Sequence, residues 1–257
     1  ESYGYEVPGL GYGYFKYTGS DLETVVIPET IAGFELTSHY RMFSDLTQDN
    51  SLEKVVFEGG NVKSAPAMFY GSNLNKINLE DYNSSNLETI SHMFSNASIA
   101  NLNIGNFGGK LKSIDSAFSG FKTVSSDLSG FDLTGLNNLS YLFAGVTATS
   151  LNLSGIDVSQ VTNMSNLFSN SQIESLNVSD WNTSNVETMV STFSDFKTTS
   201  DLNLSHFDMK NVINASTMCE SAWFAPFTNF VPPVINAEKP ILLEKMFSEI
   251  NVETLKV

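Results

Sequence analysis

The sequence predicts an α/β solenoid, in which coils of about 25 residues stack along one axis and share one parallel β-sheet. Two columns of large apolar residues repeat in step at intervals of 24 to 26 residues. The first column is Phe43, Phe69, Phe94, Phe118, Phe143, Phe168 and Phe193, and the second is Tyr82, Phe107, Phe131, Ile156, Trp181 and Phe207. We expect both columns to be buried between neighbouring coils.

One half of each repeat reads as a short strand. Apolar and polar residues alternate at 77–79, 102–104, 151–153, 176–178 and 202–204, with a weaker copy at 126–128. Alternation with period two is typical of a strand that buries one face. Residues 25–27 and 55–57 resemble first copies, and 255–257 resemble a further copy. We therefore expect nine or ten strands in one parallel sheet.

The other half of each repeat predicts one or two turns of α- or 3₁₀-helix on the opposite side of the coil. Leu87, Ile90, Met93 and Phe94 have the spacing of a helix face, and Ser85 with Glu88 has the spacing of a capping box, as does the pair Ser184 and Glu187. A left-handed residue is expected two positions after the phenylalanine, at Gly71, Asn96, Gly120, Gly145 and Asn170.

The chain divides into two segments. Residues 1–19 are rich in Tyr and Gly and are predicted to form an N-terminal cap or a linker, with an aromatic binding strip as the alternative. Residues 20–257 are predicted to form a solenoid of about nine coils. We expect this solenoid to continue or to be truncated at its C-terminal end, and any surface anchor to lie outside the chain.

Composition excludes several classes of partner. The formal net charge of −15 argues against nucleic acid and against anionic lipid, which both need a basic surface. No apolar run is long enough to cross a membrane, so no membrane insertion is expected. Cys219 is the single cysteine, so no disulfide forms within the chain. Because it follows Met218 in a column otherwise held by Phe, we expect it to be buried rather than reactive.

No catalytic constellation is visible, and the chain is not expected to be an enzyme. The histidines His39, His92 and His206 fall in different places of the repeat, so neither a metal site nor a triad is predicted. The glycines at positions 9, 11 and 13 lack the strand and helix that phosphate binding requires. No cofactor is expected, and acidic loops that hold Ca²⁺ weakly are the less favoured alternative to a solvated surface.

Residues 151–168 and 176–189 are good copies of the unit L-x-L-S-x-F-D-x-S-x-V-x-x-M-x-x-M-F-S. This unit resembles the BspA-like leucine-rich-repeat bacterial surface proteins, in the 25-residue form found in lactic-acid bacteria and mycoplasmas. The segments 26–33 and 40–43 look like the start of such domains, and the resemblance covers residues 20–257. It implies a right-handed leucine-rich-repeat-like coil, an extracellular location on a bacterial cell and, often, adhesion to host or neighbouring cells; it implies no catalytic residues.

The candidate binding surface is the column of residues that point out of the strands. These residues are Asn78, Asn103, Asp127, Asn152, Asn177 and Asn203. The face is polar and lacks aromatic anchors, which favours weak multivalent contact with a protein or a glycan. The alternatives are a ladder that only keeps the sheet soluble, and a structural spacer that presents another domain.

Nine Asn-x-Ser sequons accompany the repeat. They lie at Asn83, Asn96, Asn138, Asn152, Asn163, Asn177, Asn182, Asn203 and Asn214. Because the repeat itself is written Leu-Asn-Leu-Ser, we interpret them as by-products of the repeat, with glycosylation as the alternative.

Overall fold

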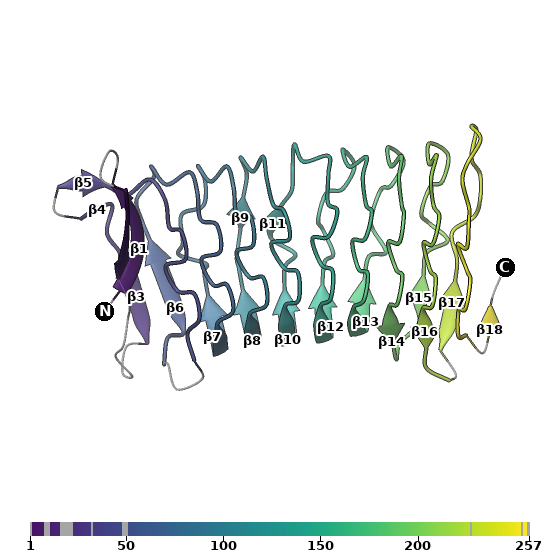
Figure 1. The fold of residues 1–257 in the computed structure, drawn as a ribbon, viewed down its shortest axis with the longest axis horizontal. Helices are drawn as coiled ribbons and strands as arrows, with labels where there is room; N and C mark the ends of the chain where they lie inside the picture. The colour runs from purple at the N-terminus through teal and green to yellow at the C-terminus, as the bar shows by residue number, and fades with distance from the viewer. Residues whose placement is uncertain are drawn as a thin grey trace.

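The computed structural model describes residues 2–7, 11–15, 23–31, 33–47, 51–226, 228–252 and 254–255. Within them the chain forms a parallel β-solenoid whose strands follow one another along the long axis (Figure 1). Nine strands make the main sheet, the predicted number in the predicted direction. In spatial order they are β3 (Thr24–Ile27), β6 (Lys54–Phe57), β7 (Asn73–Asn78), β8 (Ser98–Asn103), β10 (Lys122–Asp127), β12 (Thr147–Asn152), β13 (Gln172–Asn177), β14 (Lys197–Thr198) and β16 (Trp223–Phe224). The strand expected at 202–204 and the described part of the one expected at 255–257 lie in a separate sheet, however, and residues 197–198 and 223–224 complete the main sheet instead.

Smaller sheets accompany the main one. Parallel strands β9 (Phe107–Gly108) and β11 (Phe131–Asp132) lie farther along two coils, and β15 (Leu202–Asn203), β17 (Asn229–Val231) and β18 (Thr254–Leu255) form a parallel sheet near the C-terminal end. Antiparallel pairs join β1 (Ser2–Val7) to β2 (Gly11–Phe15) and β4 (Thr30–Ile31) to β5 (Phe34–Glu35). Whether the first pair acts as a cap, a linker or a binding strip stays a prediction.

The two predicted apolar columns form the core. The Phe column is buried, and its rings lie 5.0–5.6 Å apart from Phe43 to Phe193. All six residues of the second column are buried as well. Cys219 continues the first column and is buried, as expected, and burial raises the pKa of its thiol. Because each ring contacts rings of the neighbouring coils, the core runs the length of the array.

The predicted helices are wrong: the described residues contain no α- or 3₁₀-helix. In their place each coil has a six-residue turn segment, and we call the nine segments together the turn ribbon. They span 40–45, 66–71, 91–96, 115–120, 140–145, 165–170, 190–195, 216–221 and 244–249. The second and the sixth residue of every segment have positive φ. The left-handed residues expected at 71, 96, 120, 145 and 170 are therefore confirmed, but they do not end helices.

Backbone hydrogen bonds explain why the ribbon is not helical. Leu167 and Ser169 donate their N–H groups three residues back, to Met164 and Asn166, as in β-turns. The N–H groups of Asn166, Phe168 and Asn170 instead donate to carbonyls of the next coil, at 2.8 Å each. In an α-helix these N–H groups would instead donate to carbonyls four residues back in the same coil. The ribbon thus satisfies its backbone and also links coil to coil, with apolar residues at the same three- and four-residue spacing as a helix.

The expected capping boxes have a different role. The N–H and the hydroxyl of Ser85 both donate to Asn83 Oδ1, at 3.1 and 2.7 Å. The N–H of Ser184 donates in the same way to Asn182 Oδ1 at 3.1 Å. These serines therefore close turns that begin two residues earlier, rather than starting helices.

One buried polar pair interrupts the apolar core near its N-terminal end. His39 Nδ1 and the Tyr82 hydroxyl share a hydrogen bond of 2.6 Å, and the buried His39 Nε2 has no hydrogen-bond partner among the described residues. Burial lowers the pKa of His39 to about 3 and raises the pKa of Tyr82. His39 therefore stays neutral at ordinary pH.

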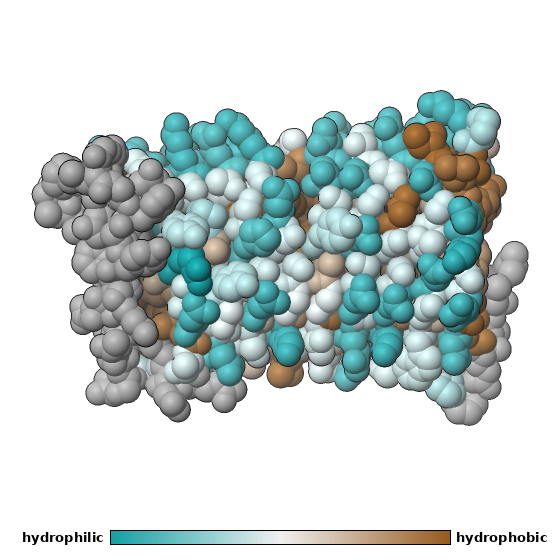
Figure 2. Space-filling view, viewed as in Figure 1, coloured by the Kyte–Doolittle hydropathy of each residue, from teal (hydrophilic) through white to brown (hydrophobic). Residues whose placement is uncertain are grey.

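The face seen in Figure 2 is mostly hydrophilic or neutral, and hydrophobic side chains gather on it toward the C-terminal end. The exposed apolar residues in the last described coils are Ile213, Val234, Ile235, Leu242 and Leu243. Among the described residues, no helix combines the length and the apolar character of a membrane span.

Candidate functional site

The predicted binding residues form a column along one end of the strands. Asn78, Asn103, Asp127, Asn152 and Asn177 lie opposite one another on β7, β8, β10, β12 and β13. All five side chains are half-buried or exposed, so they point away from the core as expected. The sixth residue, Asn203, lies on β15, which pairs with β17 and not with β13. The column is therefore continuous over five strands and is interrupted before the sixth.

Every residue of this column closes the turn that follows its strand. The side-chain Oδ1 atom accepts the backbone N–H two residues later, at 2.9–3.2 Å, in all six cases. This is the Asx turn, which only Asn and Asp form with this geometry. The residue type of the column thus has a structural cause in each coil, independent of any ligand.

A second set of bonds involves the side-chain amides of the column, and two of these bonds join neighbouring coils. Glu80 accepts from Asn103 Nδ2 at 2.8 Å and from Asn78 Nδ2 at 3.2 Å. These two bonds lower the pKa of the Glu80 carboxyl. Asn152 Nδ2 donates to Asp127 Oδ1 at 3.0 Å. Bonds from the N–H and the hydroxyl of Ser129, with a smaller contribution from Asn152, lower the pKa of Asp127. Both carboxylates therefore stay charged in mildly acidic solution.

Part of the column borders a shallow hollow on the sheet. The hollow has a volume of about 460 Å³ and lies over β7, β8 and β10. Asn78, Asn103 and Asp127 line it, together with Lys76, Asn101, Ser125 and Glu80. Amides, a hydroxyl, an ammonium group and two carboxylates surround this space, so it offers both hydrogen-bond donors and acceptors. This composition suits a hydroxyl-rich or peptide-like ligand better than an apolar one.

The Asx turn also accounts for the sequons. Among the nine Asn-x-Ser sequences, the asparagine accepts the N–H of its own serine at every position except Asn96. These turns recur at three places in the coil, after the strand, after the second apolar column and before the turn ribbon. The pattern Asn-x-Ser thus closes turns of the repeat, a role that the sequence interpretation did not foresee, and the choice between by-product and glycosylation stays a prediction.

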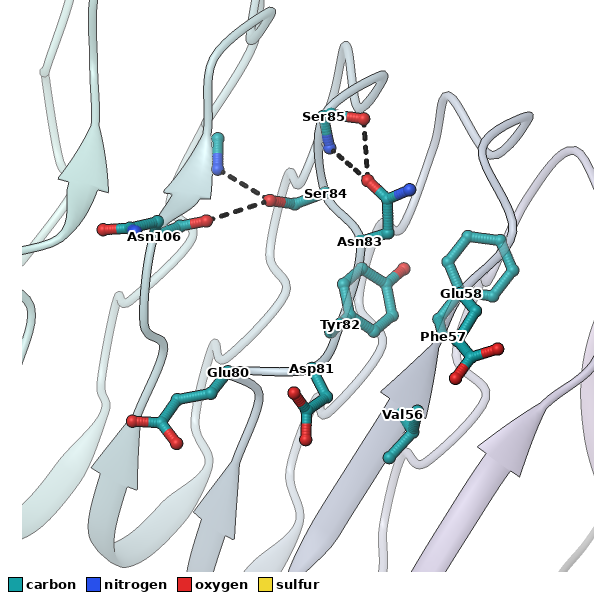
Figure 3. A pocket seen from close by; sticks show the side chains of 11 residues that line it. Val56, Phe57, Glu58, Glu80, Asp81, Tyr82, Asn83, Ser84, Ser85 and Asn106 are labelled. Atoms are coloured by element: carbon teal, nitrogen blue, oxygen red, sulfur yellow. Dashed lines mark hydrogen bonds between the residues drawn. The ribbon is translucent and has the colours of Figure 1, made fainter.

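A second, larger hollow was not anticipated from the sequence. It has a volume of about 690 Å³ and is shown in Figure 3. The rings of Phe57 and Tyr82 lie 5.6 Å apart in its wall, and the carboxylates of Glu58, Glu80 and Asp81 line it. Ser84 Oγ donates to Asn106 O at 3.5 Å and accepts the N–H of Gly108 at 3.0 Å. Glu80 lines both hollows and so connects them.

The carboxylates of this second hollow do not make a metal centre. Lys54 neutralises Asp81 through an ion pair of 2.5 Å. No group of three or more His, Cys, Asp and Glu side chains in the described part of the chain is arranged to hold a metal ion. His39 lies against the two rings, with ring centroids 4.7 Å from Phe57 and 5.6 Å from Tyr82, but its bonded nitrogen faces the Tyr82 hydroxyl.

Stacked coils, a parallel sheet and a linking turn ribbon define a repeat protein of the β-solenoid class. A family model matches this chain over residues 37–148 and 112–230, more than half of its 257 residues. The chain belongs to that family, whose description is "Mycoplasma protein of unknown function, DUF285". Neither the curated proteins nor the solved structures contain a match to it.

Proposed function

We propose that the chain is a cell-surface binding module, an adhesin that makes weak multivalent contact with a protein or glycan of a host or neighbouring cell. The main support is the column that repeats without a break over five strands next to a polar hollow. Repetition of one polar surface allows many small contacts to add up, because each further contact is intramolecular once the first has formed.

The resemblance to BspA-like surface proteins belongs to this proposal, as does the location outside a bacterial cell. Membership in a family described for Mycoplasma is compatible with both. The net charge of −15 supports a partner other than nucleic acid and other than an anionic membrane. Neither a cofactor nor a catalytic step is part of the proposed function.

A structural spacer is the second candidate, and one observation favours it. All six column residues accept a turn N–H, so the repeat would retain them even in a protein that binds nothing. A test of adhesion must therefore avoid the column residues themselves, because their loss would open turns.

The flanking positions on the strands allow a cleaner test. Asn101, Ser125 and Ser175 are exposed on β8, β10 and β13. We propose changing all three to Lys, which adds three charges to the strand face without opening an Asx turn. The matched control changes Thr134, Asn137 and Gln160 to Lys, which are exposed in the loops beyond the strands. Beads coated with each variant are then tested for attachment to epithelial cells and to mucin, with circular dichroism as the check on folding.

The adhesin proposal expects the strand-face variant to lose at least tenfold in attachment, while the control variant stays within about twofold of the unmodified protein. Loss in the control variant alone would mean that the binding face lies elsewhere. Attachment that neither variant changes, or that the unmodified protein never shows, would favour the spacer.

A further inference from the structure

The turn ribbon carries a further candidate binding site, in its first three segments, where the residues differ from those of the other repeats. Two positions of each ribbon segment hold mostly polar residues: the one three residues before the stacked aromatic ring is half-buried or exposed, and the one directly after the ring is buried or half-buried. Serine is the most frequent residue at both, for example at Ser91, Ser140, Ser165, Ser95 and Ser169. The first two segments carry Tyr40, Pro66 and Tyr70 there, and no other segment has a ring-bearing residue at either position. These three rings therefore distinguish the first two segments from the rest of the ribbon.

These ring-bearing residues come together in space. Tyr40, Pro66 and Tyr70 line one hollow of about 280 Å³, together with Arg41, Ala67, Ser91 and His92. Arg41 is the single arginine of the chain and takes a position that small or polar residues hold in most other segments. None of these residues borders either of the two hollows beside the strands. The site is therefore separate from the proposed adhesive face.

Arg41 is held in place on three sides. Its Nη2 atom donates to Asp45 Oδ2 at 2.9 Å and its Nε atom to Ser44 Oγ at 3.3 Å. The guanidinium carbon lies 5.4 Å from the ring centroid of Tyr70, over the ring. These two bonds use two of the five N–H groups of the guanidinium, and the other three have no acceptor among the described residues. Asp45 offsets the positive charge, so the hollow is nearly neutral while donors remain.

The hollow is lined by polar as well as apolar groups, and polar side chains bond to two of the lining residues. Ser91 Oγ lies 3.1 Å from Thr89 Oγ1 and 2.9 Å from Ser113 Oγ, in a chain of hydroxyl groups. Asn96 Nδ2 donates to the Tyr70 hydroxyl at 3.4 Å. Two tyrosine rings, a proline and an alanine methyl group line the hollow, and so do the guanidinium of Arg41, the exposed imidazole of His92 and the hydroxyl of Ser91.

We propose that this hollow binds a single pyranose ring of a glycan. A pyranose has a face of C–H groups that packs on aromatic rings and an edge of hydroxyl groups that needs donors and acceptors, so a hollow lined by both kinds of group complements it. An aromatic side chain of a protein partner would pack on the rings but would leave the polar lining groups unpaired. The volume is below that of pockets for drug-sized ligands and fits one ring.

The side chains that line the hollow can be replaced by residues that other repeats carry at the same positions, so the fold should be kept. Tyr40→Ser and Tyr70→Ser restore the residue that other repeats use at the same positions, so the double variant should fold. Tyr141→Ser is the matched control, because Tyr141 is an exposed tyrosine of the same ribbon that does not line the hollow. Arg41→Asn tests the guanidinium, since Asn166 holds the equivalent left-handed position.

The experiment is an NMR titration of the intact chain with methyl pyranosides of glucose, galactose, mannose and N-acetylglucosamine, and with N-acetylphenylalanine amide. We expect at least one pyranoside to bind with a Kd on the order of 1 mM, as befits a ligand of about a dozen heavy atoms. The Tyr40→Ser/Tyr70→Ser variant should bind it at least tenfold more weakly, Arg41→Asn about threefold to tenfold more weakly, and Tyr141→Ser within about twofold.

Failure of all four pyranosides to saturate, tighter binding of the phenylalanine amide, or an equal loss in Tyr141→Ser would each overturn the proposal. The strand-face variant at positions 101, 125 and 175 should bind the pyranoside normally. Pyranoside binding by this variant therefore tests the hollow, and its attachment to cells and mucin tests the strand face, so the two proposals can fail separately.

Discussion

The main sheet and the turn ribbon both join neighbouring coils, but they do so with different backbone conformations. Each joins every coil to the next through backbone hydrogen bonds. The sheet does so with extended backbone, which any residue with a suitable side chain adopts. The ribbon does so with left-handed residues at two fixed positions of each segment, and most of these are not glycine. Hydrogen bonding between neighbouring coils therefore compensates for backbone conformations that cost about 1 kcal/mol each.

Of the substitutions predicted here, one in the stacked Phe column between the sheet and the ribbon should lower the free energy of unfolding most. Phe168 is fully buried between Phe143 and Phe193, with ring centroids 5.6 and 5.4 Å away. Phe168→Ala should lower the free energy of unfolding by about 3–5 kcal/mol, because a cavity remains where the ring stood. Urea denaturation followed by circular dichroism measures it. The same change should broaden or split the transition, because coils on either side then lose their coupling. An unchanged midpoint would mean that the stacked column does not hold the array together.

A proline at a left-handed position of the turn ribbon should destabilise the protein much more than a proline at the position before it. Tyr141 has a φ of 60° and donates its N–H to Ser165 O at 3.2 Å. Tyr141→Pro should cost about 3 kcal/mol or more, because proline has no N–H and fixes φ near −65°. The neighbouring Ser140→Pro should cost only about 1 kcal/mol, since Pro66 already occupies the same position three coils earlier and only the bond to Asn138 is lost. Similar losses in the two variants, measured by denaturation, would contradict the ribbon geometry.

The extended strands could be predicted from the sequence, whereas the left-handed residues of the turn ribbon could not. Alternation at 151–153 and 176–178 predicts strands, and stacked phenylalanines at constant spacing predict the core; both predictions are confirmed. The spacing of Ile90, Met93 and Phe94 does not distinguish a helix from successive β-turns, because both bring apolar residues inward every three or four positions. The distinguishing residues are the second ones of each segment. Arg41, Ala67 and Tyr141 carry no sequence signal for positive φ.

The candidate sites were predictable to different degrees. The outward column followed from strand alternation, but its turn-closing bonds could only be seen once Asn152 and Ser154 were placed. The hollow around Tyr70 brings together residues from three coils, and only the stacking register places them next to one another. A comparison of Tyr70 with the serines of the other repeats would have marked it as unusual without showing a site.

A buried histidine near the N-terminal coils should make stability depend on pH. The pKa of His39 falls to about 3 on folding from an ordinary value of 6.5, so the unfolded chain binds more protons between these values. Stability is therefore fully present above pH 6.5 and is lost as pH falls toward 3. At pH 5 the loss is about 2 kcal/mol, from 1.36 kcal/mol for each pH unit.

The double variant His39→Leu/Tyr82→Phe gives the control for this pH dependence. Leu139 and Phe107 hold the equivalent places in other coils, so neither buried polar group is left unpaired. Thermal melts should show a flat profile for the variant between pH 6.5 and 5. A decline below pH 4.5 should remain in both proteins, since hydrogen bonds lower the pKa values of Glu80, Asp127 and Asp157 in the fold. An equally steep decline of the variant above pH 5 would exclude His39 as its source.

The smallest predicted effect concerns the strand-end column and separates its two roles. Asn177 Oδ1 accepts both the N–H and the hydroxyl of Ser179, at 3.2 and 2.8 Å. Asn177→Ala should cost about 1 kcal/mol in a denaturation experiment, because these two donors lose their acceptor. Asn177→Asp should cost less than about 0.5 kcal/mol, because a carboxylate oxygen accepts the same bonds, as Asp127 does at 3.0 Å in its own coil. If Asn177→Asp were as destabilising as Asn177→Ala, turn closure would not explain the column. If it instead left stability intact and reduced bead attachment, the amide would have a function that the fold does not require, and the column would belong to the adhesive surface.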